Sequence, residues 1–577
     1  MAVLISILKE KIKRSIQESF KKEFEKKEFS PEITPCTSEK FGHYQCNDPL
    51  KLTKILKQTP SEIAKKIVSN IKDKKIFEKI EISKNGFINF IFDKNFISNE
   101  LDAIFQDPYL GVIPKKNKKI IVEFSSPNVA KELHVGHLRS TIIGESLSRL
   151  FEFLNYSVLR LNHIGDWGTQ FGMLIAYLKQ KKEILEQASL SELTNWYKEA
   201  KKRFEKDSEF AKKTKEEVVK LQSEEKEELE IWEKICAISR KAYNEIYNLL
   251  DVKILERGES YYNPFLKGIV KDLEKKNLIT ISDGAKCIFL EGFTSRENTP
   301  LPLIVQKSDG GFNYVTTDIA AMKQRALEEK ADRIITVIDQ GQSLHLKMVH
   351  EACVKAKYID PSKTKFEHVA FGVVLGPDGK KFKTREGETV KLLDLLTEAI
   401  NKAKEILIKK DPLISNHRLE KLSHILGINA IKYSDLSCHR LKDYKFSYER
   451  MLKFEGNTST FLLYSYVRIM GIKRKLKNDP KKLLKFAKID LKHPTEISLG
   501  LHLIRFAEVI ENMEKDLLPN RLADYLYELA EKFNAFFRDC HVIGSKEQNN
   551  RLKLCELTAK ILKKGFYILG LQVTESL

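Results

Sequence analysis

The spacing of apolar residues predicts a small mixed domain at the start of this chain. Apolar side chains recur every four residues in the first twenty positions, at Leu8, Ile12, Ile16 and Phe20, as in an amphipathic helix. A run of strand type at 87–92 follows the turn signal Asn85-Gly86. We therefore expect an α+β domain over 1–110, ending before a basic linker at 114–116.

From Lys118 the pattern alternates between short apolar runs and longer helical stretches. The expected elements are strands at 120–124 and 158–162 and helices at 138–153 and 168–178. This alternation predicts a parallel α/β unit whose ligand lies beyond the carboxyl ends of the strands. Residues 180–250 are densely charged and lack proline, which indicates a helical insertion.

A second α/β half follows the insertion. Strand signals occur at 252–257, 277–292, 302–316, 334–338 and 368–375, and a helix is expected from Ser343. A loop rich in glycine and lysine then covers 376–388. We expect one catalytic domain over 115–390 and a helical region over 391–577, with a separate C-terminal domain from about 450.

Charge and cysteine content narrow the class of protein. The 577 residues carry a formal net charge of +20, which favours a nucleic-acid partner, although a lysine-rich proteome is an alternative. The eight cysteines show neither Cys-x-x-Cys spacing nor zinc-finger histidines, as expected of free thiols in the cytoplasm. No signal peptide and no apolar run near 18 residues is present, so we expect no membrane segment.

Two motifs carry the predicted chemistry. His134-Val135-Gly136-His137 follows the first apolar strand and opens a helix, which suits a nucleotide phosphate chain. The loop 379–387 brings four cations to the second half, where they would neutralise a polyphosphate. Each motif alone has a simpler interpretation, as a helix start with solvated histidines and as a solvated basic hairpin.

The two motifs in this order resemble those of class I aminoacyl-tRNA synthetases, and the arginyl family in particular. His134–His137 is similar to the HIGH signature and Lys381–Arg385 to the KMSKS loop. Further matches to the arginyl family are 123–128, Gly165–Gly172, Thr384–Gly387 and 456–468, so the resemblance covers essentially the whole chain. It implies a Rossmann-type catalytic domain with a helical insertion, an N-terminal α+β domain that contacts the tRNA body, and an all-α anticodon-binding domain.

The same resemblance implies ATP-dependent activation of L-arginine to arginyl adenylate and transfer to the 3′-terminal adenosine of tRNA(Arg). The implied ATP-binding residues are His134, Gly136, His137, His345, Lys381, Lys383 and Arg385. Thr384 stands where the KMSKS motif usually has its second lysine, and Lys131 is similar to the family lysine thought to replace that charge. Lys131, His134, His137 and Lys381 are the implied catalytic residues; Mg²⁺ would accompany ATP, with no protein metal site.

An arginine pocket needs carboxylates for the guanidinium group. The implied residues are Glu123, Asn128, Glu259, Tyr314, Asp318 and Gln342. Tyr314 and Asp318 are four apart where a strand is expected to feed a helix, so both can face one cleft. Asp318 as a helix N-cap and Glu259 as a loop carboxylate remain alternatives.

In the C-terminal region, Tyr464, Tyr466 and Arg468 are candidates for contact with unstacked tRNA bases, although packing is expected for at least one tyrosine. We expect a monomer. A cytidylyltransferase-like enzyme would share the histidine motif but would need neither the helical C-terminus nor the arginine pocket. An inactive RNA-binding paralogue would have lost the motifs, and a cysteinyl synthetase would need a zinc-type cysteine cluster.

Overall fold

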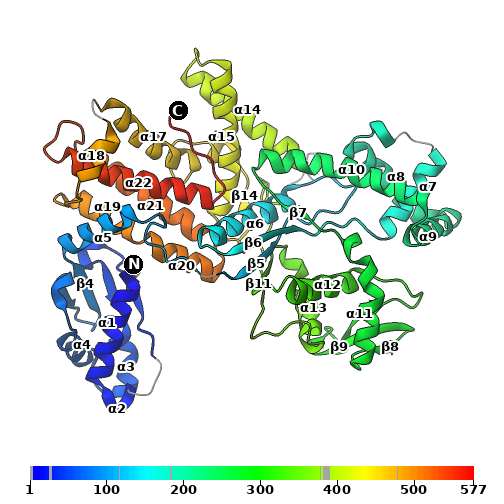
Figure 1. The fold of residues 1–577 in the computed structure, drawn as a ribbon, viewed down its shortest axis with the longest axis horizontal. Helices are drawn as coiled ribbons and strands as arrows, with labels where there is room; N and C mark the ends of the chain where they lie inside the picture. The colour runs from blue at the N-terminus through cyan, green and yellow to red at the C-terminus, as the bar shows by residue number, and fades with distance from the viewer. Residues whose placement is uncertain are drawn as a thin grey trace. The chain divides into compact units, whose positions relative to one another are not determined.

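The computed structural model describes residues 4–24, 29–115, 117–181, 185–376, 378–380, 390–476 and 479–577. The chain forms two compact units (Figure 1). The first unit comprises 1–114, 453–567 and 572–577, and the second comprises 115–452 and 568–571. Helices at 392–436, which the sequence places in the C-terminal helical region, are therefore part of the second unit.

The N-terminal part of the first unit is an antiparallel sheet covered by helices. Its strand order is β1-β2-β4-β3, with β1 (Ile33–Pro35), β2 (Tyr44–Cys46), β3 (Phe77–Ile82) and β4 (Ile88–Phe92). The helices are α1 (Leu4–Ser19), α2 (Lys21–Phe24), α3 (Asp48–Leu56), α4 (Pro60–Ser69) and α5 (Lys94–Gln106). The expected α+β domain is confirmed: α1 buries Leu8, Ile12 and Ile16 on one face, as their four-residue spacing requires.

The C-terminal part of the first unit is helical. It contains α17 (Ser459–Lys475), α18 (Pro480–Phe486), α19 (Pro494–Ile504), α20 (Phe506–Asp516), α21 (Asn520–Asp539) and α22 (Gln548–Ile568). The buried Tyr44 hydroxyl donates to Glu508 over 2.9 Å, and Arg505 donates to the carbonyl of His43 over 2.8 Å. These contacts join the N-terminal sheet to α20 and its neighbours within one unit.

A five-stranded parallel sheet forms the centre of the second unit. Its order is β12-β11-β5-β6-β7, with β5 (Lys119–Glu123), β6 (Ser157–Asn162), β7 (Leu255–Glu256), β11 (Arg333–Thr336) and β12 (Lys365–His368). The direction of strand addition reverses between β5 and β11, as in a Rossmann fold, so the carboxyl ends of these strands open the crevice where ligands bind. Helix α6 (Val135–Phe153) follows β5 and packs on β5 and β6 (Figure 1).

The remaining elements of the second unit are insertions and flanking helices. The helical insertion continues from α7 (Thr169–Lys181) through η3 (Leu185–Gln187), α8 (Leu190–Lys206), α9 (Ser208–Gln222) and α10 (Lys226–Leu249). An antiparallel sheet of β8 (Thr280–Ser282), β9 (Ala285–Thr294) and β10 (Pro300–Gln306) packs with α11 (Asn263–Lys275), α12 (Tyr314–Lys323) and α13 (Ser343–Lys355). Beyond these lie β13 (Val374–Leu375), α14 (Leu392–Lys410), α15 (Asn416–Leu436), β14 (Tyr444–Lys445) and α16 (Tyr448–Met451).

Two strand predictions need correction. The run 302–316 is a strand only to Gln306, because Asn313 caps α12 by accepting a hydrogen bond from the backbone of Val315 and the chain becomes helical at Tyr314. The run 368–375 is broken: β12 ends at His368, and Val374–Leu375 pairs with β14 instead. A short run with apolar residues does not by itself separate strand from other structure.

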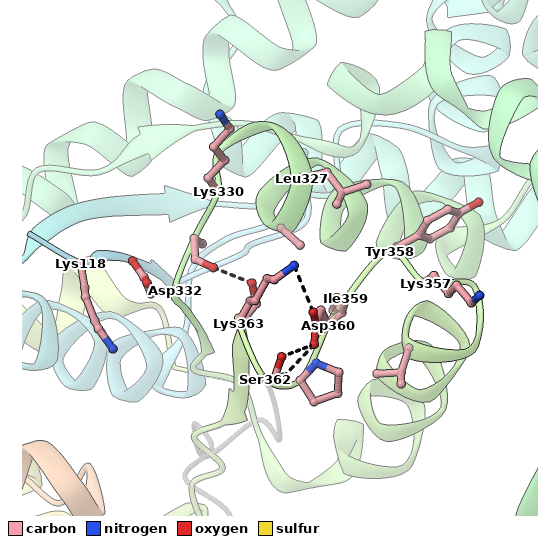
Figure 2. Close-up of a pocket in the computed structure, with 15 residues that line it drawn as sticks. Lys118, Leu327, Lys330, Asp332, Lys357, Tyr358, Ile359, Asp360, Ser362 and Lys363 are labelled. Atoms are coloured by element: carbon pink, nitrogen blue, oxygen red, sulfur yellow. Dashed lines mark hydrogen bonds and ion pairs between the residues drawn. The ribbon is translucent and has the colours of Figure 1, made fainter.

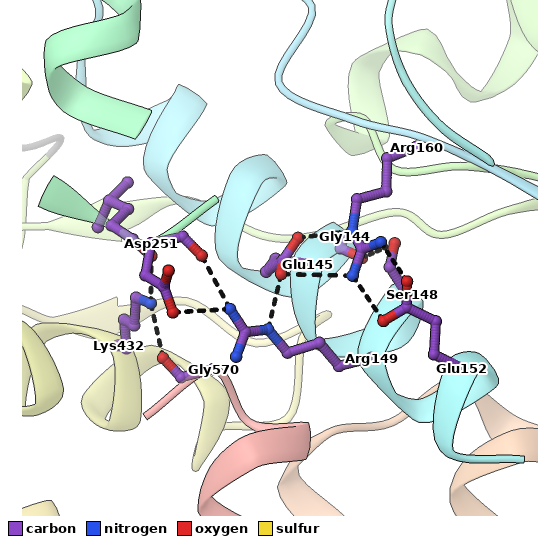
Figure 3. Close-up of polar contacts among 10 residues, drawn as sticks. Gly144, Glu145, Ser148, Arg149, Glu152, Arg160, Asp251, Lys432 and Gly570 are labelled. Carbon is purple, nitrogen blue, oxygen red and sulfur yellow. Dashed lines mark hydrogen bonds and ion pairs between the residues drawn. The ribbon is translucent and has the colours of Figure 1, made fainter. Parts of the chain in front are cut away.

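The carboxyl-terminal half of α6 is fixed by a buried polar network (Figure 3). Arg149 donates to Glu145 over 2.6 Å and to Asp251 over 3.0 Å. Lys432 on α15 is fully buried and donates to the carbonyls of Leu250 and Gly570 over 2.5 and 2.6 Å. The helix that begins at the histidine motif therefore has little freedom to shift along its axis.

Candidate active site

The histidine motif forms the amino end of α6. His134 is the N-cap residue, and its Nδ1 accepts the backbone N–H of Gly136 over 3.1 Å. His137 Nδ1 in turn accepts the backbone N–H of His134 over 3.1 Å, and the two ring centroids are 4.0 Å apart. A Cβ on Gly136 would lie 2.9 Å from the His134 ring, so glycine is required for this ring position.

These hydrogen bonds define the tautomer of both rings. A backbone N–H can only donate, so Nδ1 of each imidazole is an acceptor and the ring proton is on Nε2. Burial lowers the pKa of His134, and it lowers the pKa of His137 to about 3, helped by the neighbouring His134 and Lys131. Both rings are therefore neutral near pH 7 and present Nε2–H donors at a helix amino terminus.

The loop between β5 and α6 has an unusual backbone. Ser125, Ser126 and Ala130 have φ values of +71°, +47° and +60°, a region that side chains other than glycine seldom adopt. Asn128 lies in this loop and forms a parallel bridge with Gly165, where a Cβ would come within 2.2 Å of the Asn128 Oδ1. Such strain is concentrated at functional sites, and here it holds exposed Asn128 against the loop after β6.

Lys131 is the nearest described cation before the motif. Its Nζ lies 5.3 Å from the centroid of the Tyr197 ring, and burial, followed by the charge of Lys201, lowers its pKa. Among the described residues no carboxylate pairs with this lysine.

Lys381, Lys383 and Arg385 lie outside the described residues. The residues that follow them do pair with the motif: Lys391 forms an antiparallel bridge with His134, and the N–H of Leu392 donates to the Leu133 carbonyl over 2.8 Å.

A second group of predicted residues meets on α12 and α13. Tyr314 and Asp318 are one helical turn apart on α12, and Tyr314 is 60% exposed. His345 on α13 lies with Nε2 2.6 Å from the Asp318 carboxylate and with its ring edge-on to Tyr314 at 5.0 Å. His345, expected among the ATP-binding residues, therefore lies beside Asp318, which was expected in the arginine pocket. Asp318 is in mid-helix, so its alternative as an N-cap is wrong.

Glu123 ends β5 with its carboxylate already paired. Arg325, which is 3% exposed, donates a hydrogen bond to it, and Thr336 at the end of β11 donates over 3.5 Å. Burial opposes the charge of Arg325, but the neighbouring Glu123 and, to a smaller extent, Asp318 raise its pKa. Glu123 and Arg325 thus form a buried ion pair at the end of β5, where the direction of strand addition reverses.

Glu259 begins η4 (Glu259–Tyr262), directly after β7. Burial raises the pKa of Glu259 to about 8, and the neighbouring carboxylates of Asp318 and Asp166 add to the increase. A strongly shifted carboxyl group beside other carboxylates is typical of a site that receives a cation. Gln342 lies at the end of η6 (Gln340–Gln342) and is exposed.

Three further residues belong to this cluster and were not singled out from the sequence. His163 follows β6, with Nε2 3.7 Å from the Asp318 carboxylate and a buried Nδ1 that has no hydrogen-bond partner among the described residues. Asp166 accepts the backbone N–H and the hydroxyl of Ser260 over 2.8 and 2.6 Å. For His163 and Asp166, the position just before the Gly168 turn could have indicated a role in the site. Arg325 lies in the π-helical η5 (Gln324–Glu328), and its sequence context gave no such indication.

A hollow among the described residues lies elsewhere. It has a volume of about 960 Å³ and is lined by Lys118 before β5, Asp332 before β11 and residues 357–364 before β12 (Figure 2). These positions are at the amino ends of the strands, and none of the predicted site residues lines it. The residues of the candidate site follow the carboxyl ends of β5, β6, β7 and β11 instead, apart from Tyr314 and Asp318 on α12, which follows β10.

On the first unit, the exposed Tyr464 lies beside the half-buried Arg468. The Arg468 guanidinium lies 4.5 Å from the Tyr464 ring and 5.4 Å from Phe537, and both aromatic side chains are 40% exposed. Asn534 fixes the arginine through a 2.7 Å hydrogen bond. Tyr466 is 4% exposed and packs in the interior.

The described part of the chain contains no group of three or more His, Cys, Asp or Glu side chains arranged to hold a metal ion. Over the same residues, no helix has the length and apolar character needed to cross a membrane.

Comparison with known protein families shows which family has this fold. A family model described as the catalytic domain of class I (R) tRNA synthetases matches residues 101–448, so the chain has a class I synthetase catalytic domain. Models of the arginyl-tRNA synthetase N-terminal domain and the DALR anticodon-binding domain match 6–92 and 462–577. The chain belongs to the arginyl-tRNA synthetase family.

Individual relatives match this chain in sequence or structure over nearly its full length. The chain is 57% identical to an arginine--tRNA ligase of Protochlamydia amoebophila and 53% identical to one of Chlamydia caviae, each over 95% of both chains. The crystal structure of arginyl-tRNA synthetase from Plasmodium falciparum matches with a TM-score of 0.87 and 35% identity over 100% of both chains.

Proposed function

We propose that the chain carries out the reaction of its family at the amino end of α6 and the carboxylate cluster beside α12. The α-carboxylate of L-arginine attacks the α-phosphorus of ATP, which forms arginyl adenylate and releases pyrophosphate. A ribose hydroxyl of the 3′-terminal adenosine of tRNA(Arg) then attacks the adenylate carbonyl carbon, and AMP leaves. The observation that carries this proposal is the pair of neutral histidines whose Nε2–H groups are free to donate.

In this proposal the histidines stabilise the charge that develops on the phosphates during adenylate formation. Gly136 leaves the His134 ring in place and allows the nucleotide close to the backbone. Lys131 supplies positive charge near the same helix start. It replaces the charge of the second KMSKS lysine, whose position is taken by Thr384. Lys381, Lys383 and Arg385 complete the phosphate site from the loop that ends beside His134. Fixed donors of this kind act mainly in the transition state.

The arginine pocket is formed by Asp318 and Glu259, with Tyr314, Asn128 and Gln342 around the substrate. His163 and His345 fix the Asp318 carboxylate, and the buried pair of Glu123 and Arg325 holds the ends of β5 and η5. Two carboxylates match the planar donors of a guanidinium group. The support for this assignment is the concentration of acidic groups there, Glu259, Asp318 and Asp166.

We propose that Mg²⁺ arrives with ATP. The described residues offer no protein cage for a divalent ion, and Mg²⁺ commonly keeps its waters and binds through phosphate oxygens. When bound, it supplies further charge neutralisation on the phosphates.

For tRNA binding, we propose that Tyr464 and Arg468 form a stacking platform for an unpaired base of tRNA(Arg). Exposed aromatic rings beside a guanidinium suit such contacts. Tyr466 acts only through packing. The N-terminal domain of 1–110 would contact the body of the same tRNA.

We further propose that the protein works as a monomer in the cytoplasm. The eight cysteines are free thiols and six of them are buried, as expected in a reducing compartment. The molecular mass measured by sedimentation at micromolar concentration tests whether the protein is a monomer.

Charging of total tRNA with each of the twenty labelled amino acids tests the proposed reaction. We expect arginine, with ATP and Mg²⁺, to be the amino acid transferred to tRNA. Transfer of another amino acid, or failure with every amino acid by a folded protein, would overturn it.

A further inference from the structure

Arg139 is a buried arginine on the helix that begins at the histidine motif. It follows His137 by two positions on α6, and its side chain is 1% exposed. Its Nε lies 2.9 Å from the carboxylate of Asp435 on α15. This ion pair compensates the buried charge, and the Nη groups of the guanidinium remain for other contacts.

The same guanidinium contacts the chain at β13 and at β14. One Nη donates to the carbonyl of Gly372, before β13, over 2.7 Å and to the carbonyl of Lys442, before β14, over 3.3 Å. The rings of Phe371 and Tyr444 lie beside it, with centroids 5.8 and 5.3 Å from the guanidinium carbon. Arg139 therefore attaches both segments to α6.

The backbone around Gly372 is tightly packed. Its N–H donates to the Arg440 carbonyl over 2.9 Å, and a Cβ at this position would lie 2.6 Å from the Asp443 carboxylate. Asp443 also accepts the N–H of Val373 over 2.7 Å, and β13 then pairs with β14. A displacement of Gly372 is therefore passed on to β13.

Strand β13 leads directly into the loop that carries the predicted phosphate-binding lysines. After this strand, the N–H of Gly376 donates to the carbonyl of Lys380 over 2.7 Å, and the N–H of Gly379 donates to Gly376 over 3.0 Å. Lys380 precedes Lys381, which the proposed function assigns to ATP. The loop therefore starts with a tight turn on the strand pair that Arg139 holds.

The segment that follows this loop is attached to the same end of α6. Lys391 forms an antiparallel bridge with His134. The Lys391 Nζ also lies 2.9 Å from the Glu132 carboxylate and 3.1 Å from the Ser191 hydroxyl of α8. The chain before and after the loop is thus fixed relative to the histidine motif.

We propose that Arg139 is a positioning residue for adenylate formation, an inference that rests on the proposed function. By holding the carbonyls of Gly372 and Lys442, it keeps the start of the lysine-bearing loop in a fixed position relative to the two histidines. Arg139 contacts no substrate and transfers no proton. The histidines and the lysines then meet one polyphosphate in a prepared geometry, so the cost of ordering them is not added to the activation barrier.

Arg139→Lys separates positioning from charge. Lysine keeps a cation beside Asp435 but lacks the planar fork that reaches both backbone carbonyls. The measurement is the rate constant of pyrophosphate release in the first turnover, with tRNA(Arg) and saturating ATP and arginine. We expect this rate constant to fall by about 10²-fold, the cost of a small misplacement of reacting groups. The KM for arginine should stay unchanged, because the proposed arginine pocket is on α12 and η4.

Loss of stability alone would give a different result. A partly unfolded variant has fewer active molecules, so the amplitude of the first turnover falls while its rate constant stays the same. An unchanged rate constant for Arg139→Lys would therefore overturn the inference and leave Arg139 with a purely structural role. Failure of the original chain to release pyrophosphate with arginine would instead count against the proposed function.

Arg160→Lys is the matched control. Arg160 pairs with Glu145 and Glu152 in later turns of α6, and we expect this variant to keep the rate constant of the original chain. An equal loss in both lysine variants would show that the effect does not come from the contact with β13 and β14, and would also overturn the inference.

Asp443→Ala tests the same junction from the exposed side. It removes the acceptor of the Val373 N–H without changing the buried ion pair, so the rate constant should fall while the arginine KM stays the same. If Arg139→Lys does not fold, this variant decides the matter. An unchanged rate constant would then mean that the position of β13 does not affect catalysis, and the inference would be wrong.

Discussion

The backbone N–H of His134 donates to Nδ1 of His137 over 3.1 Å. This hydrogen bond ties the second histidine of the motif to the cap of its own helix and leaves its Nε2–H available as a donor. The Nδ1 of His134 is engaged in the same way by Gly136. The motif therefore uses Nδ1 of each ring for local structure and leaves each Nε2–H as a donor.

Two substitutions of His137 separate these roles. Asparagine places its amide near the Nδ1 position and can keep the local hydrogen bond, whereas glutamine reaches the Nε2 position and can keep the donor. We expect His137→Asn to lower kcat by about 10²–10³, the usual cost of one such donor. His137→Gln should retain more activity but melt at a lower temperature. Single-turnover kinetics and calorimetry measure the two effects, and equal kcat losses in both variants would contradict this division.

Asp318→Asn tests the guanidinium site. The substitution keeps the volume and removes the charge that His345 and the substrate share. We expect arginine binding to weaken by about 1.5–3 kcal/mol, the range for hydrogen bonds to charged groups, with little change in ATP affinity. Citrulline should also lose its disadvantage relative to arginine. An unchanged arginine KM would show that Asp318 is outside the pocket.

The buried pair of Arg139 and Asp435 should control stability. Their side chains are 1% exposed and lie 2.9 Å apart, which joins α6 to α15 within the second unit. Arg139→Met leaves the Asp435 carboxylate buried without its partner, so we expect a loss of about 3–5 kcal/mol of unfolding free energy. The double variant Arg139→Met with Asp435→Leu should recover part of it. Denaturant unfolding gives both values, and no recovery would mean that packing on Phe371 and Tyr444 dominates.

Tyr464→Ala should weaken tRNA binding by about 1–3 kcal/mol, the cost of losing one base stacked on an aromatic ring. Tyr466 is two residues further along α17 and is buried. Tyr466→Phe is therefore the matched control and should leave tRNA affinity unchanged. Filter binding at fixed salt measures both. Equal affinities for the Tyr464 variant and the original chain would move the contact to another surface.

The sequence predicted the elements whose signal is local. The four-residue spacing of Leu8, Ile12 and Ile16 and the alternation after Lys118 lie in short windows, and the structure contains the corresponding helix and parallel strands. Predictions failed where a single residue changed the outcome. Asn313 caps a helix, and so the end of the run 302–316, expected as strand, is the start of α12.

The site was predictable only in part for a related reason. The histidine motif is contiguous, so its chemistry could be inferred from four adjacent residues. The partners of Asp318 come from after β6 and from α13, which are separated from it by long stretches of chain. Arg325 forms an ion pair with Glu123 from a π-helical turn, which no simple sequence periodicity predicts. Such pairings follow from the tertiary fold and became visible only there.

ATP–pyrophosphate exchange with and without tRNA is the most direct test of the account. The predicted result is exchange that requires arginine and is strongly stimulated by tRNA(Arg), because Thr384 leaves the KMSKS-type loop without its usual second lysine. Rapid exchange with arginine in the absence of tRNA would contradict the tRNA requirement. Exchange supported by a different amino acid, and not by arginine, would contradict the assignment of the pocket and of the reaction.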